Sequence, residues 1–393
     1  MTIRLGVIGL GAVAQAVHLP LVARRPGLFR LSALCDLAPD LADAMGERFG
    51  VPPACRFTRA EDLLAAGGLD AVLIAARGSH AAAVGAAWAA GLPVFSEKPL
   101  AYTIAEADDL LAVSSPPPLM VGYMKQYDPA VERAAEIVAG LDDVRSIEAT
   151  VLHPPGMSQL EIARLVAPAP LPAAVQTGLE AEETRLQRLA TGDAGTDLWR
   201  AYRGALVSSL AHDLSILRSF GRPPLTVDHA DLWRMSSARQ RRDPGRDRKS
   251  FGQHPPSIQA TGTLPGGGRY TLAWHYLPDF PAYRETVRVV HGAGCVELAF
   301  PSPYLLNAPT ELVVSELDGD AERRTVHRSP TEAFDRQLEA FAALVTDGEP
   351  PRTGLEGARA DILDCQRIVA RYAARAGVRV GGEVGALAAA GVT

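Results

Sequence analysis

The residues best suited to chemistry in this sequence form a short glycine-rich turn near its start. The turn follows the apolar run 3–10 and consists of Gly9, Leu10, Gly11, Ala12, Val13 and Ala14. In this G-x-G-x-x-A pattern the first glycine permits the tight bend, the second lets the backbone approach a pyrophosphate, and the alanine permits close packing of a helix on a strand. The backbone N–H groups of Ala12 and Val13, at the start of the following helix, would then face the phosphates.

A second candidate group is the carboxylate of Asp36, which ends the apolar run 29–35. At the tip of the second strand of a βαβ unit, a carboxylate can accept hydrogen bonds from both ribose hydroxyls of an adenosine. Turn and aspartate together predict a dinucleotide site, whereas either one alone is also compatible with an ordinary turn or a surface aspartate. Because Leu37 follows, and not an arginine that could meet a 2′-phosphate, the sequence favours NAD, with NADP as the alternative.

Two further residues are candidates for acid–base chemistry. Lys98 lies between the predicted strand 93–95 and Pro99 and has little freedom, so partial desolvation beside a coenzyme would bring its amine into a useful acid–base range. The alternative for Lys98 is a salt bridge to Glu97. His212 lies on a predicted helix on one narrow stripe with Ser208 and two further serines. Small hydroxyls around one histidine favour a stripe that lines an enclosed polar cleft, while a structural histidine is the alternative.

Composition limits the classes of function that remain. The chain has 393 residues, 47% of them hydrophobic, and a net charge of −6, which describes a globular protein with room for two domains and no basic face for nucleic acid. Its four cysteines have no C-x-x-C spacing, so we expect neither a metal site nor a disulfide framework, and we expect a cytoplasmic protein. No apolar stretch reaches the length of a membrane span, which is about 20 residues.

The order of the predicted elements gives the fold class. Apolar strands at 69–76, 93–95 and 119–122 alternate with helices such as 40–49 and 81–90, which is typical of a doubly wound parallel sheet. Two capping boxes, Thr58 to Glu61 and Thr103 to Glu106, predict helix starts. The glycine turn, the segment 97–99 and the segment 122–129 should share the crevice at the carboxyl ends of the strands. We assign residues 1–122 to this dinucleotide-binding domain.

Residues 123–393 form the predicted second domain, of class α+β. Alternating runs at 258–264 and 269–276 flank a proline–glycine turn, which predicts a hairpin. Further strand-like runs continue the series, and their succession predicts one large open, mainly antiparallel sheet followed by two helices. The strand-like runs are 146–152, 285–291, 295–300 and 311–316, and the two helices are 331–346 and 354–376. The basic run 239–249 is predicted to be a solvated loop, with an anion site as the alternative.

Several of these motifs together resemble the Gfo/Idh/MocA oxidoreductases, which include glucose–fructose oxidoreductase and inositol dehydrogenase. The resemblance lies in the strand-ending Glu97-Lys98-Pro99-Leu100, the upstream loop with His80, the segment 122–129 and the late helix around His212. It extends over nearly the whole chain. An E-K-P at the end of a strand is far more specific than a glycine turn.

The resemblance implies roles for particular residues. Lys98 would contact the nicotinamide ribose and the reacting hydroxyl, and Pro99 would set the local backbone. Lys125 would reach into the same cleft, where the family often has arginine, so the charge is kept and the bidentate fork is lost. Ser208 stands where the family commonly has an aspartate one turn before the histidine. The remaining positions implied are Ala76, His80 and Glu97 at the coenzyme and Tyr127 at the substrate.

These observations predict an NAD(P)-dependent oxidoreductase that moves a hydride between the nicotinamide and a secondary alcohol or ketone of a sugar, cyclitol or sugar-like metabolite. Lys98 and His212 are its predicted catalytic residues. One alternative is a redox-neutral elimination or epimerisation through a transient ketone, and another is a catalytically silent nucleotide-binding protein. The expected partners are a small sugar-like substrate and copies of the same chain, as a homodimer or homotetramer through the sheet of the second domain. Neither nucleic acid nor a membrane is expected.

Overall fold

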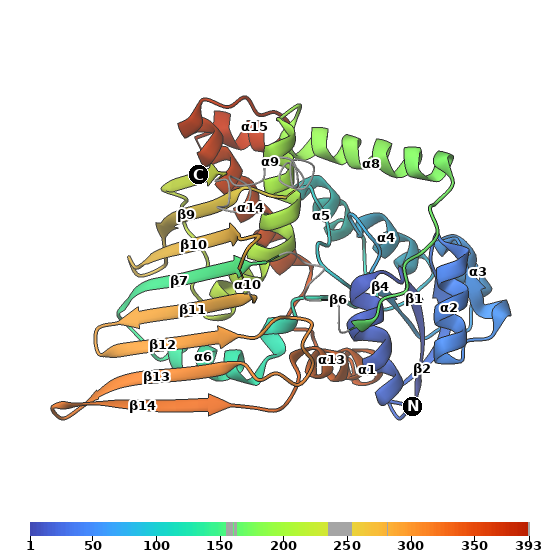
Figure 1. Ribbon diagram of the computed structural model, residues 1–393, viewed down its shortest axis with the longest axis horizontal. Coiled ribbons are helices and arrows are strands. Elements are labelled where there is room, and N and C mark those ends of the chain that lie inside the picture. The colour runs from blue at the N-terminus through green and yellow to red at the C-terminus, as the bar shows by residue number, and fades with distance from the viewer. Residues whose placement is uncertain (155–159, 161–162, 235–253, 281, 392–393) are drawn as a thin grey trace. The chain divides into compact units, whose positions relative to one another are not determined.

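The computed structural model describes residues 1–154, 160, 163–234, 254–280 and 282–391, and the chain divides into two compact units (Figure 1). The first unit consists of Met1–Met124, Leu160–Leu186 and Ala333–Arg359. The second consists of Lys125–Gln159, Gln187–Glu332 and Ala360–Thr393. The basic run 239–249 lies outside the described residues. None of the helices in the described part combines the length and the apolar character needed to span a bilayer.

The first unit is built on a six-stranded sheet in the order β3-β2-β1-β4-β5-β6, with every neighbouring pair parallel. This confirms the predicted doubly wound sheet. All four residues of β4 are buried, as expected for a parallel strand covered on both faces. The strands are β1 (Ile3–Ile8), β2 (Phe29–Cys35), β3 (Arg56–Phe57), β4 (Ala71–Ile74), β5 (Val94–Ser96) and β6 (Leu119–Val121).

The helices of the first unit come from three separate parts of the chain. Phe341 on α13 is fully buried and packs edge-on against Phe95 of β5, with ring centroids 5.6 Å apart, and stacks on Phe29 of β2 at 6.4 Å. A late helix therefore completes the core of the N-terminal sheet. The helices are η1 (Ala14–His18), α1 (Leu19–Arg24), α2 (Pro39–Phe49), η2 (Pro53–Cys55), α3 (Ala60–Ala66), α4 (Ala81–Ala89), α5 (Ile104–Leu111) and α13 (Ala333–Asp347).

The second unit is built on an eight-stranded mixed sheet in the order β14-β13-β12-β11-β7-β10-β9-β8 (Figure 1). Its pairs are antiparallel except β7 with β10, where Ser146 pairs with Arg269 in parallel register. This confirms the predicted open, mainly antiparallel sheet, in which the early strand β7 inserts between two late strands. The strands are β7 (Val144–His153), β8 (His229–Trp233), β9 (Ser257–Thr263), β10 (Arg269–Tyr276), β11 (Arg284–His291), β12 (Gly294–Phe300), β13 (Glu311–Asp318) and β14 (Ala321–Arg328).

Helices of the second unit include α6, which contacts β12 and β13, and η5, which contacts β10. The predicted helix around His212 belongs to a longer run in which α9, the π-helix η5 and α10 follow one another directly. The helices here are η3 (Met124–Tyr127), α6 (Pro129–Ala139), α9 (Thr196–Ala201), η5 (Tyr202–Leu210), α10 (Ala211–Ser219), α14 (Leu355–Ala376) and α15 (Gly382–Ala389). Three helices begin in the first unit and continue into the second: η3, α14 and α8 (Ala173–Thr191).

Of the two predicted capping boxes, one is present. Thr103 accepts a hydrogen bond from the backbone N–H of Glu106, and the Glu106 side chain accepts one from the Thr103 N–H. The box at Thr58 is wrong, since α3 begins one residue later with Arg59 at its N-cap and no side-chain cap. The Glu61 carboxylate lies 3.6 Å from the Arg59 guanidinium instead.

Candidate active site

The glycine turn has the geometry that a dinucleotide site requires. Gly9 has a φ of +92°, and a Cβ there would lie 2.3 Å from the backbone nitrogen of Ala76, so a side chain is excluded on both counts. Gly11 is exposed, and a Cβ built on it would meet nothing within 4 Å. Ala14 is fully buried against the sheet. The turn is therefore tight on the protein side and open where a pyrophosphate would approach Gly11, Ala12 and Val13.

Asp36 is fixed beside this turn at the tip of β2. Its Oδ2 accepts a hydrogen bond from the Leu10 N–H at 2.8 Å, and its Oδ1 accepts one from the Ala38 N–H at 3.0 Å. Each carboxylate oxygen has a second lone pair, and the side chain is only half-buried. The residues present therefore fit a nicotinamide dinucleotide, whose adenosine ribose would lie at Asp36.

His80 braces the loop that follows β4. Its ring is 2% exposed, with Nε2 lying 2.7 Å from the carbonyl oxygen of Ala76 and Nδ1 lying 2.6 Å from that of Glu97. Two carbonyl acceptors favour the doubly protonated ring, but burial outweighs them and lowers the pKa of His80. The histidine thus ties the loop after β4 to the end of β5, and Ala76 also touches the glycine turn.

The segment after β5 is held by an interior carboxylate. Glu97 is 4% exposed; its Oε1 lies 2.7 Å from His18 Nε2, and its Oε2 accepts the Lys98 backbone N–H at 3.1 Å. Burial alone would raise the pKa of Glu97, but the bond to His18 and the charges of His18 and Lys98 lower it. The Lys98–Pro99 peptide bond is cis, and the Lys98 side chain is half-buried. Gly122 packs against Glu97 so closely that its Cβ would lie 2.9 Å from Oε2.

The structure thus brings the predicted coenzyme residues together at the carboxyl edge of one sheet. Gly9 contacts Ala76, and His80 bonds to the backbones of Ala76 and Glu97. Lys98 is the next residue in the chain after Glu97.

The predicted substrate residues lie in the second unit. His212 is 6% exposed and lies on α10, while Ser208 lies in η5 and donates its hydroxyl hydrogen bond to the Arg203 carbonyl. Ser215 and Ser219 likewise donate to carbonyls of their own helix, at 2.7 and 2.8 Å. These hydroxyls therefore satisfy the helix backbone, as short polar side chains in helices often do.

Lys125 is part of a buried charged cluster, which we define as Lys125, Asp213, Tyr283 and Glu285. Lys125 Nζ forms an ion pair with Glu285, and the Tyr283 hydroxyl donates to the same carboxylate. Burial, followed by the nearby Glu285 charge, raises the pKa of Asp213 well above its usual range. Burial also opposes charge on Glu285, but Lys125 and the hydrogen bonds of its neighbours lower the pKa of Glu285. The two shifts favour the charge on Glu285 and the proton on Asp213.

Other contacts place this cluster relative to the predicted substrate residues. Lys125 Nζ lies 5.0 Å from the centroid of the Phe300 ring, and Tyr127 is 3% exposed. Gln126 donates to the Ser215 carbonyl at 3.0 Å, which ties the Lys125 segment to α10. The cluster therefore holds the helix that carries His212.

Sequence reasoning missed Glu285, although a signal was present. In β11 the residues Glu285, Val287 and Val289 alternate onto the buried face. A carboxylate at an inward-facing strand position requires a buried partner, because an isolated interior charge is costly. Gln15 was also missed; its amide bonds to the backbone beside the glycine turn, and no local pattern in the sequence marks it.

Comparison with known proteins agrees with this geometry. Residues 3–122 match the model of the oxidoreductase family with an NAD-binding Rossmann fold, GFO_IDH_MocA. The chain is similar to inositol 2-dehydrogenase of Corynebacterium glutamicum (strain R), with 35% identity over 144 residues, which are 35% of this chain and 41% of that protein. The chain thus matches about two fifths of the length of this curated relative.

Solved structures share the fold over nearly the whole chain. Aldose-aldose oxidoreductase from Caulobacter crescentus aligns with a TM-score of 0.68 and 20% identity, covering 97% of this chain and 100% of that one. The 3-ketoreductase KijD10 from Actinomadura kijaniata, in complex with TDP-benzene and NADP, aligns with a TM-score of 0.66 and 20% identity, covering 93% and 96%. Residues 3–122 thus match the Rossmann-fold domain of the Gfo/Idh/MocA oxidoreductase family, and the solved structures, at 20% identity, share the fold of the chain.

Proposed function

We propose that the chain is an NAD(P)-dependent oxidoreductase acting on a secondary alcohol or ketone of a sugar, cyclitol or sugar-like metabolite. The observation that carries the proposal is the carboxyl edge of the first sheet, where an open glycine turn, a fixed Asp36 and Lys98 follow strands of one parallel sheet. The names of the similar proteins, an inositol dehydrogenase and an aldose oxidoreductase, support the substrate class.

In this proposal the backbone of Gly11, Ala12 and Val13 binds the pyrophosphate, and Asp36 binds the adenosine ribose. The bound nicotinamide supplies the hydride acceptor or donor. Asp36 followed by the exposed Leu37 favours a free 2′-hydroxyl and therefore NAD. NADP stays the alternative, since the similar 3-ketoreductase was crystallised with it.

Lys98 is the proposed acid–base residue. Its backbone N–H is anchored by Glu97, so the position from which its ammonium reaches a substrate oxygen is set by an interior contact. In the oxidising direction it would polarise the hydroxyl and take its proton. His212, in the second unit, is our candidate for a further proton-handling side chain.

The test is Lys98→Ala, assayed with a panel of sugars, cyclitols and their keto forms by NADH absorbance. We expect turnover to fall by about 10²- to 10⁴-fold, the usual contribution of a positioned acid or base. Coenzyme affinity, measured by calorimetry, should change far less. Lys98→Arg is the matched control, because it keeps the charge and removes a group able to exchange protons. Unchanged turnover in Lys98→Ala would refute the assignment.

A redox-neutral reaction and a catalytically silent role are the alternatives, and the serine at position 208 keeps the silent role open. A family aspartate at that place would orient the histidine, whereas the Ser208 hydroxyl bonds to the Arg203 carbonyl. Net NADH formation equal to substrate consumed would exclude elimination or epimerisation through a transient ketone. A wild-type protein that binds coenzyme but turns over no member of the panel would favour a catalytically silent role.

We also propose that the chain forms a homodimer or homotetramer through the sheet of the second unit. Leu317 and Val326 on the outer strands β13 and β14 are 70% and 53% exposed, which supports a covering partner. Light scattering coupled to size exclusion tests the assembly, and Leu317→Lys should shift it toward monomer if the proposal holds.

A further inference from the structure

Residues 163–186 belong to the first unit although they are far in sequence from its strands. Their first part carries alternating prolines, Pro168, Pro170 and Pro172, which favour a stiff extended chain. Their second part lies in α8, where most side chains over 173–185 are exposed. A helix exposed on nearly every side buries too little apolar surface for a core to hold it. Only Leu186 and Ala190 near its C-terminal end are buried apolar residues, so polar contacts must hold the exposed part, 173–185.

The extended part is attached beside the glycine turn and beside α2. The Gln15 amide donates to the Val166 carbonyl at 3.1 Å and accepts from the Val166 N–H at 2.8 Å. Gln15 also donates to the Leu10 carbonyl within the turn, and it is 3% exposed. Further along, the Ala169 N–H donates to Asp40 at 2.7 Å. The Gln15–Val166 pair is thus a reciprocal clasp, in which Gln15 is buried and Val166 is 38% exposed.

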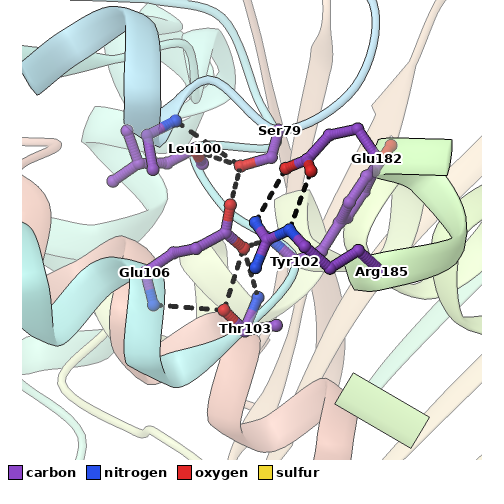
Figure 2. Close-up of polar contacts among 8 residues, drawn as sticks. Ser79, Leu100, Tyr102, Thr103, Glu106, Glu182 and Arg185 are labelled. Carbon is purple, nitrogen blue, oxygen red and sulfur yellow. Dashed lines mark hydrogen bonds and ion pairs between the residues drawn. The ribbon is translucent and has the colours of Figure 1, made fainter. Parts of the chain in front are cut away.

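The helical part lies against the loops that follow β4 and β5. The Glu183 carboxylate lies 3.7 Å from the guanidinium of Arg77, the residue that follows Ala76 in the chain. Arg185 pairs with Glu182 through two hydrogen bonds of 2.7 Å. The bond to Glu182 raises the pKa of Arg185, and the charge of Glu106 adds a smaller contribution in the same direction. Figure 2 shows this pair beside the capping box, in which Glu106 also accepts from the hydroxyl of Ser79 at 2.6 Å. The loop after β4 and the start of α5 thus offer α8 a polar surface through Arg77 and Glu106.

The anchors follow β2, β1, β4 and β5, which are four adjacent strands of the sheet. Their carboxyl ends form the edge where a dinucleotide lies in this fold class. We propose that residues 163–186 are a strap that closes over the bound dinucleotide, with Gln15 and Val166 as its clasp. The coenzyme then enters and leaves only when the strap lifts. This inference rests on the coenzyme binding proposed above.

The two halves of the strap are held differently. The Gln15 side of the clasp is buried, so water competes for its two hydrogen bonds only from the Val166 side. The Arg77 side chain is 83% exposed and that of Glu183 33%, so salt screens their ion pair. The α8 half should therefore release first, and release should quicken with ionic strength.

Coenzyme dissociation tests the strap directly. The protein is loaded with NADH and chased with excess NAD while NADH fluorescence is followed by stopped flow. Val166→Pro removes the N–H that Gln15 accepts, and Val166→Ala is the matched control that keeps it. Loss of one hydrogen bond should raise the dissociation rate about five- to tenfold in Val166→Pro, with the association rate rising too. Val166→Ala should stay near the wild-type rate.

Two further measurements keep the inference testable if Val166→Pro fails to fold. In the wild type, the Val166 and Ala169 amides should exchange more slowly with deuterium once NADH is bound. Glu183→Gln should speed dissociation at low salt and not at high salt, whereas Glu180→Gln, on the same helix, should not. Equal dissociation rates in Val166→Pro and Val166→Ala, or amide exchange unaffected by NADH, overturn the strap. A wild type that binds neither dinucleotide overturns instead the proposed function.

Discussion

Lys125→Met removes the ammonium that neutralises Glu285 while keeping the length of the side chain. Lys125 is 6% exposed and Glu285 1%, so water cannot replace the lost charge. Breaking one partner of a buried ion pair costs about 3–5 kcal/mol. The other route is protonation of Glu285, which costs about 1.4 kcal/mol for each pH unit above about 4.3, or about 4 kcal/mol at about pH 7.5. Both routes predict a loss of about 4 kcal/mol in the free energy of unfolding.

The pH dependence separates this explanation from a simple loss of packing. In Lys125→Met the folded-state pKa of Glu285 lies above its unfolded value, so the loss grows as pH rises. At about pH 5.5 it should shrink to about 2 kcal/mol. Urea unfolding at both pH values measures it, and the double variant with Glu285→Gln should recover most of the stability. A loss below about 1 kcal/mol at about pH 7.5, or one equal at both pH values, would refute the reasoning.

Three further outcomes are expected. Gly9→Ala should lose at least about 3 kcal/mol in the free energy of unfolding, because its Cβ overlaps the backbone after β4, whereas Gly11→Ala should fold normally and weaken NADH binding. Urea unfolding measures the stability and calorimetry the binding. Equal stability of the two variants would contradict the prediction. Burial raises the pKa of Asp364 to about 6, so the stability of Asp364→Asn relative to wild type should increase as pH rises from about 4 to about 6. Above about pH 6 this relative gain should level off at no more than about 3 kcal/mol. A stability difference that does not change with pH would contradict the prediction. Thr103→Ala should lose about 1 kcal/mol with the capping box at Glu106, seen as a lower urea midpoint; an unchanged midpoint would show that the cap adds nothing.

The first unit could be predicted from the sequence where local chemistry decides the structure. The glycine turn, the buried run of β4 and the cap at Thr103 are local signals, and each has its expected element. The cap at Thr58 failed because β3 pairs with Cys35 and Leu34 just before it, which fixes how the chain enters α3.

The second unit was harder because its organisation is not local. Apolar periodicity does not report strand direction, so the parallel pairing of β7 with β10 could not be read. β14, with the sequence AERRTVHR, has almost no apolar face and depends on its ladder with β13. The partners of Lys125 lie on β11 and α10, and only the Glu285 position hinted that one was needed.

The discontinuity of the first unit has a consequence for how the protein is made. Strand β6 is held by late residues: Thr353 accepts the Val121 N–H through its carbonyl, and the Gln337 and Thr353 side chains both donate to the Val121 carbonyl. The growing chain on the ribosome therefore carries an incomplete nucleotide-binding core until residues 333–359 have emerged. Assembly of the first unit should wait for them, and a fragment ending at residue 124 should leave Phe95 uncovered and aggregate.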